Sequence, residues 1–177
     1  MDLSEADRRC RGTRGRVAGG VHSGRARTAA IVHPRRLESW TTLGGEAAQR
    51  FAGTARYLLV FDAPTSARPL QLDLGRVAQS ARVRLNGRDP GVMFMPPFRV
   101  LLDDVKTHGN RLEIEVTSTA ANRIRDLDRR GVAWKTFRDI NFVSITYQPF
   151  DTSNWPLHEA GLLGPVRLQP VEAVTPR

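Results

Sequence analysis

Two glutamates that are two residues apart, Glu113 and Glu115, form a carboxylate pair that could do acid–base chemistry. Glycoside hydrolysis uses two carboxyl groups, one as an acid and the other as a base or nucleophile. These glutamates, however, alternate with apolar residues, which is the pattern of a strand with one apolar face. Arg82 and Arg84 have the same spacing in another predicted strand. We therefore expect cross-strand ion pairs and no catalysis at these glutamates.

The adjacent acids Asp103 and Asp104 raise the question of a metal site. Carboxylate oxygens are the ligands that Ca²⁺ prefers, so a structural calcium is compatible with this pair. Adjacent aspartates are more common in turns, and we expect a turn here. We expect no other cofactor, because the four histidines are scattered and the single cysteine is Cys10. The sequence also contains no Gly-rich phosphate loop and no Ser-His-Asp motif.

A charged segment with a tryptophan, residues 122–137, has the side chains that sugar recognition requires. An aromatic face covers the C–H side of a pyranose, while planar polar groups bond the hydroxyls. The candidate carbohydrate-binding residues are Asn122, Arg123, Asp126, Asp128, Arg129, Arg130, Trp134, Lys135 and Trp155. The alternative is that the tryptophans pack beneath a long loop and the charges form local ion pairs. Packing is favoured for Trp155, which precedes Pro156, and both interpretations stay open for Trp134.

The rest of the chain after residue 40 has short apolar runs separated by Gly, Pro, Asn and Asp, which is typical of strands and turns. Asn86-Gly87 predicts a tight hairpin turn. No apolar period of 3.6 residues persists over three turns, so the sequence predicts an all-β protein. We expect a jelly-roll β-sandwich of about eight strands, with 122–137 as a long connection between strands. The strands are expected over 55–61, 70–74, 81–85, 91–94, 98–102, 112–116, 140–147 and 166–168.

The basic residues are concentrated at the amino terminus. The net charge is +9, and residues 1–36 contain nine arginines and three acids. This Gly/Arg/Ala-rich segment has no helix or strand period, which predicts a disordered basic tail. No aromatic residue interrupts its arginines, so we expect no nucleic-acid binding. The chain has neither an apolar run long enough for a membrane span nor a recognisable signal peptide, which leaves the localisation open.

Several short motifs occur in one order through the predicted sandwich. They are Phe51-Ala-Gly-Thr-Ala-Arg-Tyr57, Leu72-Asp-Leu-Gly75, Ala81-Arg-Val-Arg-Leu-Asn-Gly87, Pro96-Pro-Phe-Arg-Val100, Asn110-Arg-Leu-Glu-Ile-Glu-Val-Thr117, Asn122-Arg-Ile124, Asp128-Arg-Arg-Gly-Val-Ala-Trp-Lys135, Asp139-Ile-Asn-Phe142 and Gly161-Leu-Leu-Gly-Pro-Val-Arg-Leu168. In this order they resemble the carboxy-terminal galactose-binding-like β-sandwich of large bacterial glycoside hydrolases. The resemblance is to family 106 α-L-rhamnosidases and to the sugar-binding domain of family 2. It predicts a sandwich over 37–170, after the tail 1–36 and before a short tail 171–177.

The resemblance implies a non-catalytic module, because the catalytic acid and base of that family belong to a separate barrel domain. It further implies a chain truncated or fragmented from a longer enzyme. The expected partners are a carbohydrate that contains rhamnose or galactose, or the catalytic domain of a glycoside hydrolase. The alternative is a protein-interaction module that docks on such an enzyme, or on another partner, without binding sugar. The resembled enzymes are often exported.

Overall fold

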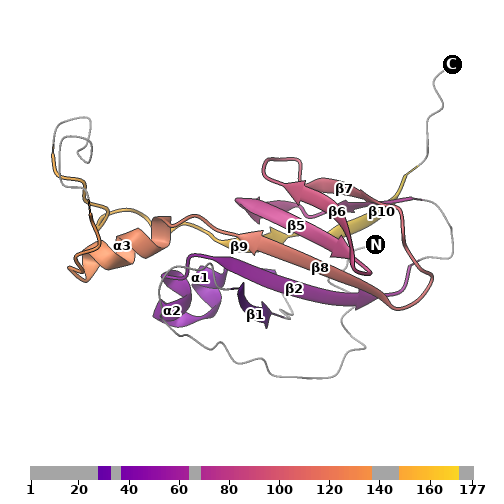
Figure 1. The fold of residues 1–177 in the computed structure, drawn as a ribbon, viewed down its shortest axis with the longest axis horizontal. Helices are drawn as coiled ribbons and strands as arrows, with labels where there is room; N and C mark the ends of the chain where they lie inside the picture. Colours follow the sequence, from indigo (N-terminus) through magenta and orange to yellow (C-terminus); the bar gives the residue numbers. More distant parts are fainter. Residues whose placement is uncertain (1–27, 33–36, 64–68, 137–147, 172–177) are drawn as a thin grey trace, which may run out of the picture.

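Two β-sheets face each other and enclose one hydrophobic core (Figure 1). The computed structural model describes residues 28–32, 37–63, 69–136 and 148–171. The predicted strand 140–147 and the rest of the two predicted tails therefore lie outside the described residues.

The larger sheet has five strands in the order β1-β2-β8-β5-β6. Along β8, Leu112, Ile114 and Val116 are buried, while the residues between them face outward. This alternation follows from the two-residue period of a strand, which gives the sheet one apolar face. The strands are β1 (Thr28–Val32), β2 (Thr54–Phe61), β5 (Ser80–Leu85), β6 (Arg88–Met93) and β8 (Asn110–Thr117).

The opposite sheet has three strands in the order β10-β3-β7, and β4 and β9 form a further pair. Leu72 on β3 is completely buried against the core, as are its neighbours on the inner face. The strands are β3 (Leu70–Asp73), β4 (Arg76–Ala78), β7 (Arg99–Leu102), β9 (Gly161–Gly164) and β10 (Arg167–Pro170). The predicted all-β sandwich is thus confirmed, with ten strands in the described residues where about eight were expected. The jelly-roll order stays a prediction.

The predicted hairpin turn at Asn86-Gly87 joins β5 to β6. Both residues have a positive φ, 51° at Asn86 and 87° at Gly87, as a tight turn between two strands requires. The Asn86 side chain also accepts a hydrogen bond from the Arg111 amide at 2.9 Å and donates one to the Asp104 carbonyl at 2.9 Å. The turn is therefore tied to the adjacent strand and to the following loop.

A close approach between Gly75 and Gly164 connects the end of β3 to the carboxy-terminal strands. Gly75 has φ +62°, and a Cβ atom there would lie 2.6 Å from the Gly164 carbonyl carbon and oxygen. No side chain fits at that distance. This contact explains the glycine at position 75, while Gly164 has a positive φ of its own, +66°, and a Cβ atom there would lie 2.8 Å from the Leu37 Cδ1.

The amino-terminal part of the described chain differs from the sequence-based expectation. Residues 28–32, inside the predicted disordered tail, form β1, which pairs in parallel with β2. Two short helices, α1 (Trp40–Leu43) and α2 (Gly45–Gln49), precede β2 where no helix was expected. These elements have four or five residues each, too few to produce a measurable period in the sequence. The apolar residues at the end of the tail give β1 its strand-like composition.

The connection after β8 also differs, because its first part is the helix α3 (Ala121–Arg129). With nine residues, this helix has two and a half turns, so its period is too short to be recognised. It projects beyond the end of the two sheets (Figure 1). In the described ranges, none of the helices combines the length and the apolar character that crossing a bilayer would require.

Candidate functional site

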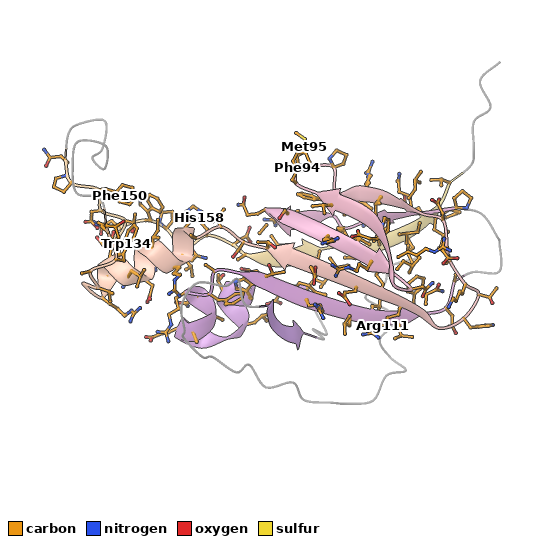
Figure 2. All side chains as sticks on the ribbon, viewed as in Figure 1. Phe94, Met95, Arg111, Trp134, Phe150 and His158 are labelled. Atoms are coloured by element: carbon orange, nitrogen blue, oxygen red, sulfur yellow. The ribbon has the colours of Figure 1, made fainter. Side chains whose placement is uncertain are left out.

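The nine candidate residues all lie in one projection at the end of the sandwich. We call residues 121–136 and 148–158 the α3 lobe. It consists of α3, the turn that follows it and the extended segment that leads back to β9. Trp134, Phe150 and His158 lie together in it, well away from Arg111 at the other end of the molecule (Figure 2).

Asp128, on the last turn of α3, is the centre of the lobe. Its Oδ1 accepts hydrogen bonds from the Trp134 Nε1 at 2.6 Å and lies 3.0 Å from the Lys135 Nζ. Its Oδ2 accepts bonds from the amide and the hydroxyl of Thr152, both at 2.8 Å. The carboxylate is only 7% exposed. Burial opposes its ionisation, but the bonds from Thr152, Trp134 and Lys135 outweigh burial and lower the pKa of Asp128 from 3.8 to about 2.

Four rings pack edge to face through the lobe. The ring centroids are 6.3 Å apart between Trp134 and Phe150, 5.8 Å between Phe150 and Trp155, and 6.5 Å between Trp155 and His158. Such edge-to-face pairs are favourable beyond the area that they bury. The Lys135 ammonium lies 5.6 Å from the Trp134 centroid and 5.7 Å from the Phe150 centroid, so it also contributes a cation–π contact.

Two side chains of α3 fasten the returning segment. Asn122 is buried, and its amide donates to the His158 carbonyl at 2.8 Å while its oxygen accepts from the His158 amide at 2.9 Å. Arg125 donates from Nε to the Trp155 carbonyl at 2.6 Å. Because this segment has no strand partner along these residues, side chains satisfy the backbone groups that a sheet would otherwise pair.

The remaining candidates are on the surface of α3. Arg130 forms an ion pair with Asp126 at 2.6 Å, one helical turn earlier. Arg123 and Arg129 are exposed, and neither has an ion pair or side-chain hydrogen bond within the described residues. These two arginines are therefore available to a ligand.

The geometry separates the candidate residues by role. Asn122, Asp128 and Lys135 use their polar atoms within the lobe, as the packing interpretation expects. The Trp134 indole N–H is also used, and its ring and that of Trp155 are half-buried, so each has an exposed part. Sequence reasoning missed four residues that complete the lobe: Arg125, Phe150, Thr152 and His158. Phe150, five residues before Trp155, was the one signal in the sequence that could have indicated them.

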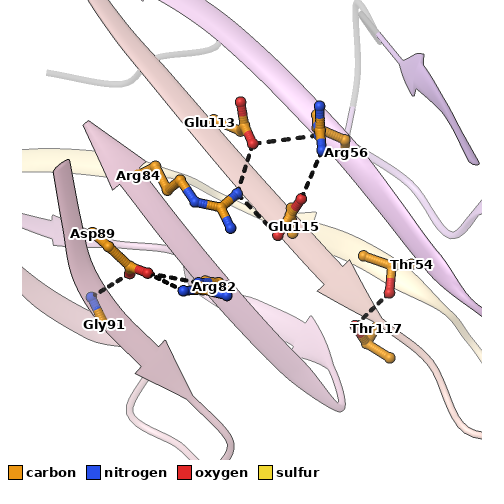
Figure 3. Close-up of polar contacts among 9 residues, drawn as sticks. All are labelled: Thr54, Arg56, Arg82, Arg84, Asp89, Gly91, Glu113, Glu115 and Thr117. Carbon is orange, nitrogen blue, oxygen red and sulfur yellow. Dashed lines mark hydrogen bonds and ion pairs between the residues drawn. The ribbon is translucent and has the colours of Figure 1, made fainter. Parts of the chain in front are cut away.

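The glutamates of β8 form the expected cross-strand network (Figure 3). Glu113 lies 2.8 Å from Arg84 on β5 and 3.3 Å from Arg56 on β2, and Glu115 contacts the same two guanidinium groups at 3.1 and 3.0 Å. Burial alone would raise the pKa of Glu115, but Arg56 and Arg84 lower it. Arg82 differs from the prediction, because it pairs with Asp89 across the β5–β6 hairpin.

The Asp103-Asp104 pair follows β7, in the loop before β8. The Asp104 carboxylate lies 3.2 Å from the Arg88 Nε. In the described ranges, no group of three or more acidic, histidine or cysteine side chains is arranged to hold a metal ion. A structural calcium stays a prediction from the sequence.

With the fold and the lobe in place, comparison with known proteins gives two informative similarities. The chain is 34% identical over 154 residues to a protein of Formosa agariphila named as a β-glucuronidase, covering 75% of this chain and 13% of the relative. Its fold is similar to that of part of a rhamnosidase from Novosphingobium sp. PP1Y, with a TM-score of 0.64 and 29% identity over 92% of this chain and 16% of that enzyme. The chain resembles one part of large glycoside hydrolases.

This glycoside hydrolase-like domain spans about an eighth of the length of the Formosa agariphila protein and about a sixth of the length of the rhamnosidase. A β-galacturonidase from Eisenbergiella tayi has a weaker similarity, with a TM-score of 0.44, 20% identity, and coverage of 58% of this chain and 17% of that enzyme. No protein-family model matches the sequence. The predicted resemblance to a module of large glycoside hydrolases is confirmed by the first two similarities.

Proposed function

We propose that residues 37–170 are a non-catalytic accessory domain of a glycoside hydrolase, and that the α3 lobe is its carbohydrate-binding surface. The observation that carries this proposal is the similarity of 92% of the chain to a small part of a rhamnosidase, and of 75% of it to a small part of a protein named as a β-glucuronidase. A rhamnose- or galactose-containing glycan is the expected class of ligand. The lobe supports this role, because it combines half-buried tryptophans with exposed arginines at one end of a rigid sandwich.

A non-catalytic role is supported by the state of the acidic side chains. A general acid needs a carboxyl group whose pKa is raised towards neutrality. The pKa of Glu115 is lowered, and that of Asp128 is lowered to about 2. Both groups are ionised at neutral pH and are bonded to donors within the domain, so neither can deliver a proton to a leaving group.

A titration of the full chain with L-rhamnose, galactose and their oligosaccharides tests carbohydrate binding. The indole N–H resonances in a ¹H–¹⁵N NMR spectrum report on the three tryptophans separately. We expect the Trp155 and Trp134 signals to shift at millimolar sugar. The Trp40 signal is the internal control, because its side chain is buried against Phe51 in the core of the sandwich, outside the lobe. An unchanged spectrum with every sugar would contradict direct carbohydrate binding.

A second candidate function, docking on another domain of a glycoside hydrolase, is favoured by a different surface. Val92, Phe94 and Met95 are 57%, 75% and 62% exposed, at the end of β6 and in the loop that follows (Figure 2). Adjacent large apolar side chains at this exposure are typical of an interaction surface. The segment 122–155, by contrast, has Val132 as the one strongly exposed large apolar residue in its described part.

Replacing Phe94 and Met95 by serine separates the two functions. If the loop is a docking surface, the double variant should lose association with a glycoside hydrolase catalytic domain. Analytical ultracentrifugation of mixtures of the two proteins measures this association. Sugar-dependent shifts of Trp155 should remain. Association that is unchanged in the double variant would exclude this loop as the docking surface.

A further inference from the structure

The charges of the α3 lobe are unevenly neutralised. Its described residues include five basic side chains and three acidic ones, apart from His158. Asp126 is paired with Arg130, and Asp128 is bonded to Lys135. The third acid, Asp151, accepts hydrogen bonds from the amide and hydroxyl of Ser153. Each carboxylate is thus engaged, and three guanidinium groups are left without a carboxylate partner in the described residues.

Two of these guanidinium groups lie on the same side of α3. Arg125 and Arg129 are four residues apart, which places their Cβ atoms about 6 Å from each other. Two like charges at this spacing repel each other and destabilise a helix slightly. Arg125 is also oriented, because its Nε donates to the Trp155 carbonyl at 2.6 Å. That bond leaves the terminal nitrogens of its guanidinium group as unused donors in the described structure.

The third group, Arg123, lies on a different side of the helix. At 100° per residue, Arg123 is about 160° around the axis from Arg125 and about 120° from Arg129. It is exposed, as Arg129 is. The lobe therefore contains a pair of adjacent arginines next to Trp155 and a single arginine that faces elsewhere.

We propose that Arg125, which bonds to the Trp155 carbonyl, and the adjacent Arg129 bind the anionic group of an acidic carbohydrate. This inference rests on the proposed function and names the class of glycan. A guanidinium group forms paired hydrogen bonds with a carboxylate or a sulfate ester, and these charge-assisted bonds are stronger than bonds to a hydroxyl. The half-buried ring of Trp155, in the same lobe, offers an apolar surface for the C–H face of the sugar. The anion also removes the repulsion between the two arginines.

The test is isothermal titration calorimetry of the full chain with three probes of equal length. They are an oligogalacturonate, a sulfated galacto-oligosaccharide and a neutral galacto-oligosaccharide. We expect at least one acidic probe to bind about tenfold more tightly than the neutral one, by the strength of bonds to charged groups. The tighter of the two acidic probes identifies the anion as a carboxylate or a sulfate. Equal binding of acidic and neutral probes would overturn this inference and leave the proposed function intact, whereas no binding at all would overturn both.

Three arginine variants decide where the anion binds. Arg129→Gln should lower the affinity for the acidic probe about tenfold and leave the affinity for the neutral probe unchanged. Arg50→Gln, exposed at the end of α2, and Arg111→Gln, at the far end of the sandwich, remove the same charge outside the lobe and should each change affinity less than about twofold (Figure 2). Equal losses in all three variants would show a diffuse effect of net charge and would overturn the assignment. Tighter binding of a single-stranded DNA oligonucleotide than of either acidic probe would also overturn it.

Discussion

The sandwich and the α3 lobe are held together by different interactions. In the sandwich, strands pair along their length, and leucines alternate into one core, so that β2 and β8 match over eight residue pairs. In the lobe, one short helix and a returning segment are joined by side chains that bond to backbone groups. The sandwich therefore depends on many equivalent contacts, whereas the lobe depends on a few that cannot replace one another.

This difference has a consequence for function. A binding surface needs charged and aromatic groups that are exposed, and such groups do not build a hydrophobic core. In this protein the sandwich provides the stable support, and the lobe uses Asp128 and Asn122 to hold its tryptophans and arginines in place. Side-chain hydrogen bonds thus provide in the lobe the order that apolar burial provides in the sandwich.

The largest effect is expected in the sandwich. Leu112 on β8 is completely buried, and replacing it by alanine should lower the free energy of unfolding by about 2–5 kcal/mol. Because β8 lies between β2 and β5, the whole domain should be affected. Urea denaturation followed by circular dichroism measures this change. Leu101→Ala, on β7, is the control, because Leu101 is 50% exposed and should cost less than about 1 kcal/mol.

A local effect is expected at the centre of the lobe. Asp128→Asn removes the charge that four donors contact, and hydrogen bonds to charged groups contribute about 1.5–3 kcal/mol. We expect the lobe to lose order while the sandwich remains folded. Hydrogen exchange should increase at the Thr152 amide and stay slow at Ile114. Asp151→Asn is the matched control, since Asp151 is exposed and bonds only to Ser153 in the described structure. A loss of the whole fold on Asp128→Asn would contradict the separation of the two regions.

Lowering the pH should also disorder the lobe while the sandwich remains folded. The pKa of Asp128 is lowered to about 2, below its usual value near 3.8, so the folded lobe favours the ionised carboxylate. The stabilisation is complete above about pH 4, near the pKa of an unfolded aspartate, and is lost as the pH falls towards 2. The Trp134 indole N–H signal should change over this range, because its partner becomes protonated. In Asp128→Asn this change should be absent, and its persistence there would assign it to another group.

Most of the sandwich was predictable, because alternation and turn chemistry are local signals. The leucines of β3 and the Asn86-Gly87 turn lie where the sequence places them. The short helices were not predictable, since α1 and α2 have four and five residues. The helix α3 was missed because its two and a half turns are too short for its apolar residues, Ala121, Ile124 and Leu127, to show a sustained period.

The composition of the candidate site was predictable, but its internal bonds were not. Tryptophans, arginines and aspartates near each other indicate a polar and aromatic surface, and all nine proposed residues lie in one lobe. Which of their polar atoms are already hydrogen-bonded within the lobe depends on contacts between residues far apart in the sequence. Asp128 bonds to Thr152, and Arg125 bonds to Trp155, over 24 and 30 residues. No local pattern contains that information, and so the adjacent Arg125–Arg129 pair was not distinguished from the other arginines.

The smallest effect is expected in the charge network on the outer face of β8. Glu115→Gln keeps the shape of the side chain and removes its attraction to Arg56 and Arg84. Because these groups are partly exposed, the free energy of unfolding should fall by about 1 kcal/mol or less. A double-mutant cycle of Glu115→Gln with Arg84→Gln, measured by urea denaturation, isolates the pair. Since Glu113 contacts the same guanidinium groups, the network should retain part of its attraction in each single variant. A loss as large as that of Leu112→Ala would mean that the sandwich depends on a few polar contacts, as the lobe does, and the contrast between the two regions would fail.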